Sequence, residues 1–222
     1  MEQSTLGVAV FTALMGVIST LIALPLGIAA AWVLARRTFP GKPVLETLLS
    51  LPLVLPPVAT GFLLLQLFGL NSPLGRALDA VGLDVVFTWK AVVMAMAVMS
   101  FPLIVLTVRA GLEQVDRRYE QVAATLGAGP WRVFGTITVP LAARSIVAGA
   151  ILGFARALGE FGATIVVAGG IPGQTQTLAV AIFNLTETGR DADASRLLLV
   201  SIGLAFGAML LANLVQRRRM PA

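Results

Sequence analysis

The sequence predicts an all-α integral membrane protein with five spanning helices, with six as the alternative. Two observations predict this fold class: an apolar composition and long runs without charge. Of the 222 residues, 57% are hydrophobic and only 12% are charged, with a mean hydropathy of +0.90. A soluble globular chain carries about 25% charged residues, so this composition argues against a soluble protein.

The residue types that are missing narrow the function. The sequence has no Cys and no His, which excludes a disulfide scaffold and the usual zinc, haem and iron–sulfur ligand sets. It also contains no GxxxxGK[ST] loop to hold nucleotide phosphates. We therefore expect no catalytic residue, no cofactor and no metal site in this chain, which is not an enzyme.

Five segments are predicted to cross the membrane, because a spanning helix needs about 20 apolar residues. A shorter fifth run contains Arg144 near one end, where its long side chain can reach the headgroups. The uncharged runs cover residues 3–35, 47–75, 91–108 and 197–216, and the remaining span, the fourth in chain order, covers 137–158.

The uncharged stretch 161–186 is predicted not to span. It contains Gly169-Gly170, Pro172-Gly173 and the polar run Gln174–Thr177, which would leave backbone groups unpaired in lipid. We expect two short pieces or a partly re-entrant loop here, and a sixth span is the alternative.

The basic residues predict an orientation with the amino terminus outside and the carboxyl terminus inside. With five spans, most of the 16 Lys and Arg residues fall on the inner side, including Arg36, Arg37 and the tail Arg217–Arg219. A sixth span would move that tail outside, which the positive-inside rule disfavours.

The spans also indicate how transport is powered. No Asp or Glu lies inside the first, second, third or fifth span, and we expect no buried carboxylate of the kind that carries a coupling ion. Active transport would therefore take its energy from another subunit.

The most polar part of the chain lies between the third and fourth spans. Half of the residues from Arg109 to Glu120 are charged, and the short run 122–126 that follows is predicted to be helical and to end at Gly127. Pro130 is predicted to begin a second helix. From the pattern alone, this segment is either an amphipathic connector on the membrane surface or a helix that docks on a cytoplasmic partner.

This segment resembles the signature loop of ABC-importer permeases. In that family the loop reads Glu-Ala-Ala, three residues, Gly, nine residues, Ile-x-Leu-Pro; here Gln121–Gly127 is followed nine residues later by Ile137–Pro140. The departures are Gln121 in the Glu position, with Glu120 one place earlier, Val122 in the first Ala position, and Val139 for Leu. The resemblance implies one type I transmembrane domain over 1–222, a coupling loop at 110–140, and a docking helix for an ATP-hydrolysing subunit. The residues assigned to docking are Glu120, Gln121, Ala123, Ala124, Leu126 and Gly127.

Further stretches extend the resemblance to the permeases of molybdate importers. They are Leu51–Val58, Ser100–Leu103, Phe154–Thr164 and Ile171–Gly173. Sulfate/thiosulfate permeases are similar around residues 156–162, and tungstate permeases share the same pattern.

The resemblance implies the function and the partners. The function is translocation of molybdate across the inner (cytoplasmic) membrane by alternating access. The partners are a second copy of the chain, two cytoplasmic ATP-binding subunits, an external molybdate-binding protein and membrane lipid, with no nucleic acid. The alternatives are sulfate/thiosulfate or tungstate transport by the same machinery and, from another class, a stand-alone channel or structural membrane subunit.

Candidate residues for the anion path or gate come from the same stretches. Pro56, Pro57 and Pro102 remove helical hydrogen bonds, so each marks either a kink facing the path or a structural bend. Arg156 and Glu160 share a helix face as a self-neutralising pair at the outer interface, or as an anion-attracting Arg moderated by a carboxylate. Two glycine pairs are expected to support close helix packing within a permease dimer. The path candidates are Pro56, Pro57, Ser100, Pro102, Arg156 and Glu160, and the glycine pairs are Gly149/Gly153 and Gly203/Gly207.

Overall fold

The computed structural model describes residues 5–217, with side chains described as far as Leu214. The described residues form helices joined by turns and short loops, and no strand occurs among them. The elements are α1 (Thr5–Arg36), α2 (Lys42–Val54), α3 (Pro57–Phe68), α4 (Pro73–Asp79), α5 (Trp89–Glu113), α6 (Arg117–Thr125), α7 (Pro130–Val133), the π-helix η1 (Phe134–Thr138), α8 (Val139–Leu158), α9 (Gly162–Ala168), α10 (Leu178–Glu187) and α11 (Asp191–Arg217).

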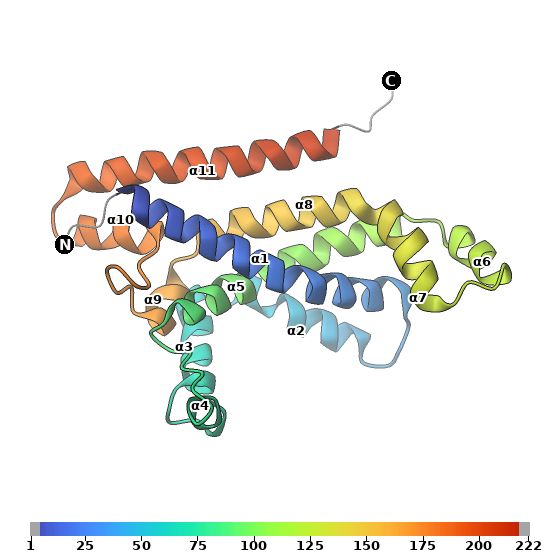
Figure 1. Ribbon diagram of the computed structural model, residues 1–222, viewed down its shortest axis with the longest axis horizontal. Coiled ribbons are helices and arrows are strands. Elements are labelled where there is room, and N and C mark those ends of the chain that lie inside the picture. Colours follow the sequence, from blue (N-terminus) through green and yellow to red (C-terminus); the bar gives the residue numbers. More distant parts are fainter. Residues whose placement is uncertain (1–4, 218–222) are drawn as a thin grey trace.

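The helices α1, α5 and α8 form the centre of the bundle (Figure 1). Ile104 of α5 is fully buried between the other two. A Cβ atom added at Gly27 of α1 would lie 2.7 Å from Ile104 Cγ2, and one at Gly153 of α8 would lie 2.6 Å from Ile104 Cγ1. Small residues therefore let these helices approach closely, which is the main packing device for helices in lipid.

The second predicted span is broken. The sequence predicts one span over 47–75, but α2 and α3 meet at an angle of 112°, and the chain continues into the separate short helix α4. Leu55 between them is extended, with φ −66° and ψ 141°, because the residue before a proline disfavours the helical region. Pro56 and Pro57 also lack amide hydrogens, so α2 cannot continue through them.

The described helices agree with the predicted number of spans. Four are long and apolar enough to cross a membrane, and the bent α2–α3 pair makes a fifth if it is counted as one span. The chain is thus a multi-pass membrane protein. In Figure 1, α1 and α11 run in the same direction, as an odd number of passes requires.

Residues 161–186 form two short helices, α9 and α10, as the sequence predicts. Gly169 and Gly170 both have positive φ values, 74° and 60°, at the end of α9. The Thr175 hydroxyl accepts a hydrogen bond from the Ile171 amide and donates one to the Ala168 carbonyl. These bonds satisfy the backbone where α9 ends, so the segment needs no continuous helix.

The loops lie at two opposite ends of the bundle. Residues 37–41 and the segment around α6 lie at one end, whereas residues 159–190 lie at the other (Figure 1). The predicted basic tail falls outside the described part, apart from the backbone of Arg217. The end that carries α6 is therefore marked by Arg36, Arg37 and Arg117.

Candidate functional site

The short helix that the sequence predicts before Gly127 is present as α6. The Asp116 side chain accepts a hydrogen bond from the Arg118 amide at 2.9 Å and so caps its first turn. The helix ends at Thr125, Leu126 is its C-cap residue, and Gly127 follows with φ +83°. There the Ala128 amide donates to the Ala123 carbonyl at 3.1 Å. The helix therefore begins five residues earlier than the run 122–126 that the sequence predicts, and it ends at the glycine that the sequence identifies.

The segment outside the bundle is shorter than the predicted coupling loop at 110–140. Helix α5 continues to Glu113, and the chain is helical again from Pro130 through η1 to Leu158. Only residues 114–129 connect the two long helices. Pro140 lies in the first turn of α8, two residues after the end of η1. Short π-helical segments such as η1 are frequent at functional sites.

Helix α6 has two opposite faces. Tyr119, Val122 and Leu126 have 60%, 59% and 83% of their surface exposed, and their spacing places them on one side. We call these three residues the docking stripe. Arg117, Glu120 and Ala124 share the opposite side, which lines a cavity between α6 and the bundle.

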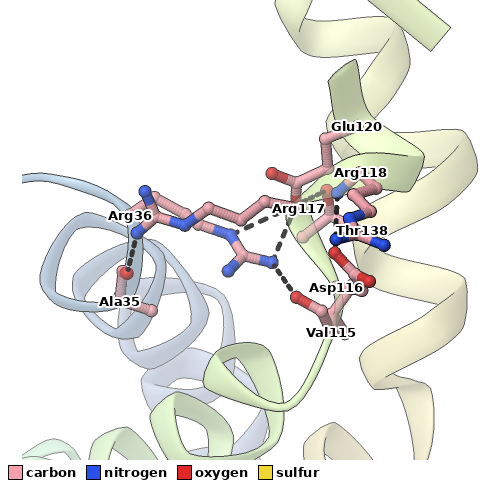
Figure 2. Close-up of polar contacts among 8 residues, drawn as sticks. All are labelled: Ala35, Arg36, Val115, Asp116, Arg117, Arg118, Glu120 and Thr138. Atoms are coloured by element: carbon pink, nitrogen blue, oxygen red, sulfur yellow. Dashed lines mark hydrogen bonds and ion pairs between the residues drawn. The ribbon is translucent and has the colours of Figure 1, made fainter. Parts of the chain in front are cut away.

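Glu120 points into the molecule, where Figure 2 shows it between three elements. Its Oε1 accepts hydrogen bonds from Nε and Nη2 of Arg36 at 3.2 and 2.9 Å, and from the Thr138 hydroxyl at 2.8 Å. Arg36 Nη2 also donates to the Val115 carbonyl at 3.2 Å. We call Arg36, Glu120 and Thr138 the α6 junction, because they join α6 to the ends of α1 and η1.

A second contact fixes the same region. Arg117 Nη2 donates to the Ala35 carbonyl of α1 at 3.0 Å (Figure 2). This carbonyl belongs to the last turn of α1, where a helix lacks its own hydrogen-bond partners and a cation is favourable. Two neighbouring residues in the last turn of α1, Ala35 and Arg36, are therefore tied to α6.

Glu160 corrects the expectation that no carboxylate is buried. Only 1% of its side chain is exposed. Its Oε2 pairs with Arg156 Nη1 at 2.8 Å, and its Oε1 accepts from the Ala163 amide at 2.9 Å. Because α8 ends at Leu158, the chain turns Glu160 inward, where an arginine and the first turn of α9 satisfy both oxygens.

The proline bend between α2 and α3 packs against the start of α9, next to the Arg156–Glu160 ion pair. A Cβ atom at Gly162 would lie 2.8 Å from Pro57 Cβ, and one at Gly61 would lie 2.8 Å from Ala163 Cα and its carbonyl oxygen. Pro56 and Pro57 are themselves exposed. The fold thus brings the bend between α2 and α3 next to Glu160, although about 100 residues separate them in sequence.

The other two path candidates lie in the interior. Ser100 and Pro102 of α5 are buried. The Ser100 hydroxyl donates to the Ala97 carbonyl at 3.2 Å, and its Cβ lies beside Gly153 of α8. Neither residue is therefore exposed on the surface of the protomer.

The sequence interpretation missed four residues at this site. Tyr119 and Val122 form the docking stripe together with Leu126. The spacing of three and four residues between these positions is a signal that the sequence contains. Arg36 and Thr138 were missed as partners of Glu120, which lies 84 and 18 residues from them. No sequence pattern marks a hydrogen bond over such a separation.

Comparison with known proteins gives close sequence relatives. Residues 23–220 match the model of the family "Binding-protein-dependent transport system inner membrane component". The chain is 49% identical over 202 residues to the molybdenum transport system permease protein ModB of Escherichia coli K12, covering 90% of this chain and 88% of that protein. The ModB protein of Haemophilus influenzae is 44% identical, over 98% of this chain and 95% of its own length. The sulfate transport system permease protein CysT of Escherichia coli K12 is 38% identical, over 86% and 71%.

Solved structures share the fold at low sequence identity. The permease fold in a crystal structure of a bacterial alginate ABC transporter, in complex with a pentasaccharide-bound periplasmic protein, superposes with a TM-score of 0.69 at 18% identity, covering 94% of this chain and 76% of that chain. An amino acid ABC transporter gives a TM-score of 0.65 at 18% identity, covering 96% and 93%. The architecture is therefore that of a type I ABC-importer transmembrane domain, and the chain belongs to the family of binding-protein-dependent transport system inner membrane components.

Proposed function

We propose that the chain is the permease subunit of an ATP-driven importer and that it moves molybdate across the inner membrane by alternating access. The molybdenum permeases of two bacteria, at 49% and 44% identity over most of their length, support molybdate as the substrate. The sulfate permease relative is 38% identical, which keeps sulfate/thiosulfate as the second candidate, with tungstate as a close analogue of molybdate.

One observation carries the proposal that a separate ATPase drives transport. Helix α6 exposes the apolar docking stripe to the outside, whereas its other face is held by the α6 junction. An exposed apolar stripe next to a polar, hydrogen-bonded face is typical of a surface that a partner covers. Two ATP-binding subunits, one for each copy of the chain, would each take one stripe.

The same structure suggests which motion the ATPase transmits. When a partner displaces α6, the junction moves the last turn of α1 and the start of the η1–α8 helix with it. These two helices pack on α5 at the centre of the bundle. A shift at α6 is therefore carried into the spanning helices, since packed helices move as rigid units.

We further propose that the transporter contains two copies of this chain and an external molybdate-binding protein. The path would lie between the copies, where Pro56, Pro57 and Arg156 are available at the surface of the protomer. The binding protein would select the anion, because the only charged side chain that is buried among the described residues is itself an anion, Glu160.

Uptake of labelled molybdate into proteoliposomes tests the function. The chain is reconstituted with a candidate ATP-binding subunit and a candidate external binding protein from the same organism, and uptake is measured with and without ATP. We expect ATP-dependent molybdate uptake that excess tungstate reduces strongly and excess sulfate reduces weakly. Uptake without ATPase would support a channel, and stronger competition by sulfate would make sulfate the substrate.

Co-purification with the ATPase tests the docking stripe separately. Val122→Asp and Leu126→Asp place a charge in the apolar contact, so we expect each to lose most of the bound ATPase. The matched control is Thr125→Asp, which puts the same charge on an exposed position of α6 that belongs neither to the stripe nor to the residues that the resemblance assigns to docking. Equal loss in all three variants would indicate a damaged helix, and retention in all three would exclude the stripe as the docking surface.

A further inference from the structure

A cavity lies between the end of α1, the inward face of α6 and the start of the α7–η1 helix. Its volume is about 330 Å³, and its lining includes Trp32, Arg36, Arg37, Arg117, Glu120 and Phe134. The α6 junction forms one wall of the cavity, and other lining side chains, such as Arg37 and Arg117, do not belong to that junction.

The charges that line this cavity do not balance. Three guanidinium groups face one carboxylate. That carboxylate, Glu120, is already paired with Arg36. Among the residues that the structure describes, the Arg117 side chain donates a hydrogen bond only to the Ala35 carbonyl, and the Arg37 guanidinium donates none, although the Arg37 backbone amide donates to the Val33 carbonyl. Two arginines therefore retain free N–H donors, and an anion is the ligand that this excess favours.

Arg37 contacts an aromatic ring rather than a side-chain hydrogen-bond acceptor. Its Cζ lies 5.6 Å from the centre of the Trp32 ring, a distance at which a cation is attracted to the face of the ring. This contact uses none of the guanidinium N–H groups, so they remain available for the oxygens of a phosphate. The cation–π contact therefore favours a position of the exposed Arg37 side chain from which it can meet an anion.

The aromatic residues place the cavity at the edge of the bilayer. Trp32 lies one turn before the end of the spanning helix α1, and Phe134 packs edge-on against it with ring centres 5.7 Å apart. Tryptophan concentrates at the level of the lipid headgroups. The cavity therefore has an apolar, aromatic floor towards the hydrocarbon and a cationic rim towards water.

From these features we propose that the cavity binds the phosphate of an anionic phospholipid headgroup, with Arg37 and Arg117 as its ligands. Basic pockets between helices at a membrane surface bind such headgroups. The headgroup would lie beside Arg36 and Glu120, and it would occupy the side of α6 that faces away from the docking stripe. The proposal requires only that the chain lies in a membrane, and it does not depend on the transported substrate.

Native mass spectrometry of the purified full-length chain with its ATPase tests this site. Complexes are exchanged into phosphatidylcholine with added phosphatidylglycerol, and the retained phosphatidylglycerol is measured. We expect retention in the wild type and about a fivefold weaker affinity for each of Arg37→Gln and Arg117→Gln, as expected for the loss of one basic contact. Arg37→Lys, which keeps the charge, should retain most of the binding.

The control is Arg132→Gln, which removes the same charge from α7 at an exposed position that does not line the cavity. Equal retention in the Arg37, Arg117 and control variants would overturn the proposal. So would competition in which inorganic phosphate or molybdate displaces all signal, because the ligand would then be a soluble oxyanion. Loss of the ATPase from Arg37→Gln with unchanged lipid binding would make the cavity a protein contact instead. None of these measurements requires transport. A failure of the proposed transport function can therefore be distinguished from a failure of the proposed lipid site.

Discussion

Arg36 and Glu120 are joined by two hydrogen bonds to one carboxylate oxygen, at 3.2 and 2.9 Å, although they lie 84 residues apart. Only 8% of the Arg36 side chain and 20% of the Glu120 side chain are exposed. The sequence assigns Glu120 to the surface that contacts the ATPase, whereas the fold turns it towards the end of α1. Glu120 therefore links α6 to the end of α1, and in the proposed mechanism it would transmit movement of α6.

The first prediction concerns this pair. Glu120→Gln removes the charge but keeps an acceptor for Thr138, and the lost charge-assisted bonds cost about 2 kcal/mol. We expect normal binding of the ATPase, normal or raised ATP hydrolysis, and a lower number of anions transported per ATP. The ratio of uptake to hydrolysis in proteoliposomes measures this.

Glu113→Gln is the matched control, because Glu113 also pairs with an arginine at the same end of the bundle but is 48% exposed. An exposed pair contributes less than about 1 kcal/mol, so its coupling ratio should stay near the wild-type value. If Glu120→Gln instead loses the ATPase altogether, Glu120 is a docking contact after all.

The second prediction concerns the stability of the buried Glu160. Glu160→Ala leaves Arg156 and the Ala163 amide without their partner, at a cost of about 3 kcal/mol. Glu160→Gln keeps an acceptor for the amide, so its cost should be about half as large. Thermal unfolding in detergent measures both, and equal melting temperatures for the two variants would contradict the capping role of Glu160.

The third prediction separates the two interpretations of Arg156. Arg156→Met leaves a buried carboxylate unpaired and should destabilise the protein, whereas Arg156→Met/Glu160→Gln removes both charges and should recover most of the lost stability. If Arg156 also attracts the anion, uptake stays low in the stable double variant. Full uptake there would mean that the pair is only structural.

The fourth prediction concerns the two glycine pairs. Gly153 faces Ile104 of the same protomer, whereas Gly203 has open space where a Cβ atom would lie. We expect Gly153→Ala to cost about 1–3 kcal/mol through overpacking, measured as a lower melting temperature. Gly203→Ala should leave the melting temperature of the protomer unchanged, and a change in oligomeric state would assign Gly203 to a contact between copies.

The sequence by itself predicts much of the fold. Long uncharged runs identify α1, α5 and α11, because the hydrocarbon core admits only helices of about that length and composition. The glycines and prolines of 161–186 exclude a further span, and Gly127 marks the end of α6. These features depend on local chemistry, so they are visible without contacts.

The tertiary structure alone decides what these elements do to one another. Pro56 and Pro57 predict a bend, but its angle of 112° depends on the packing of α3 against α9. The sequence interpretation places Glu160 at the outer interface. Only the fold shows that Glu160 is buried, and that Arg156 and the Ala163 amide offset the cost of burying its carboxylate. Likewise, Glu120 belongs to the predicted docking helix, but its partner Arg36 lies at the end of another span. Hydropathy and turn chemistry act over a few neighbouring residues, whereas the geometry of an ion pair depends on where the whole chain brings its two charges.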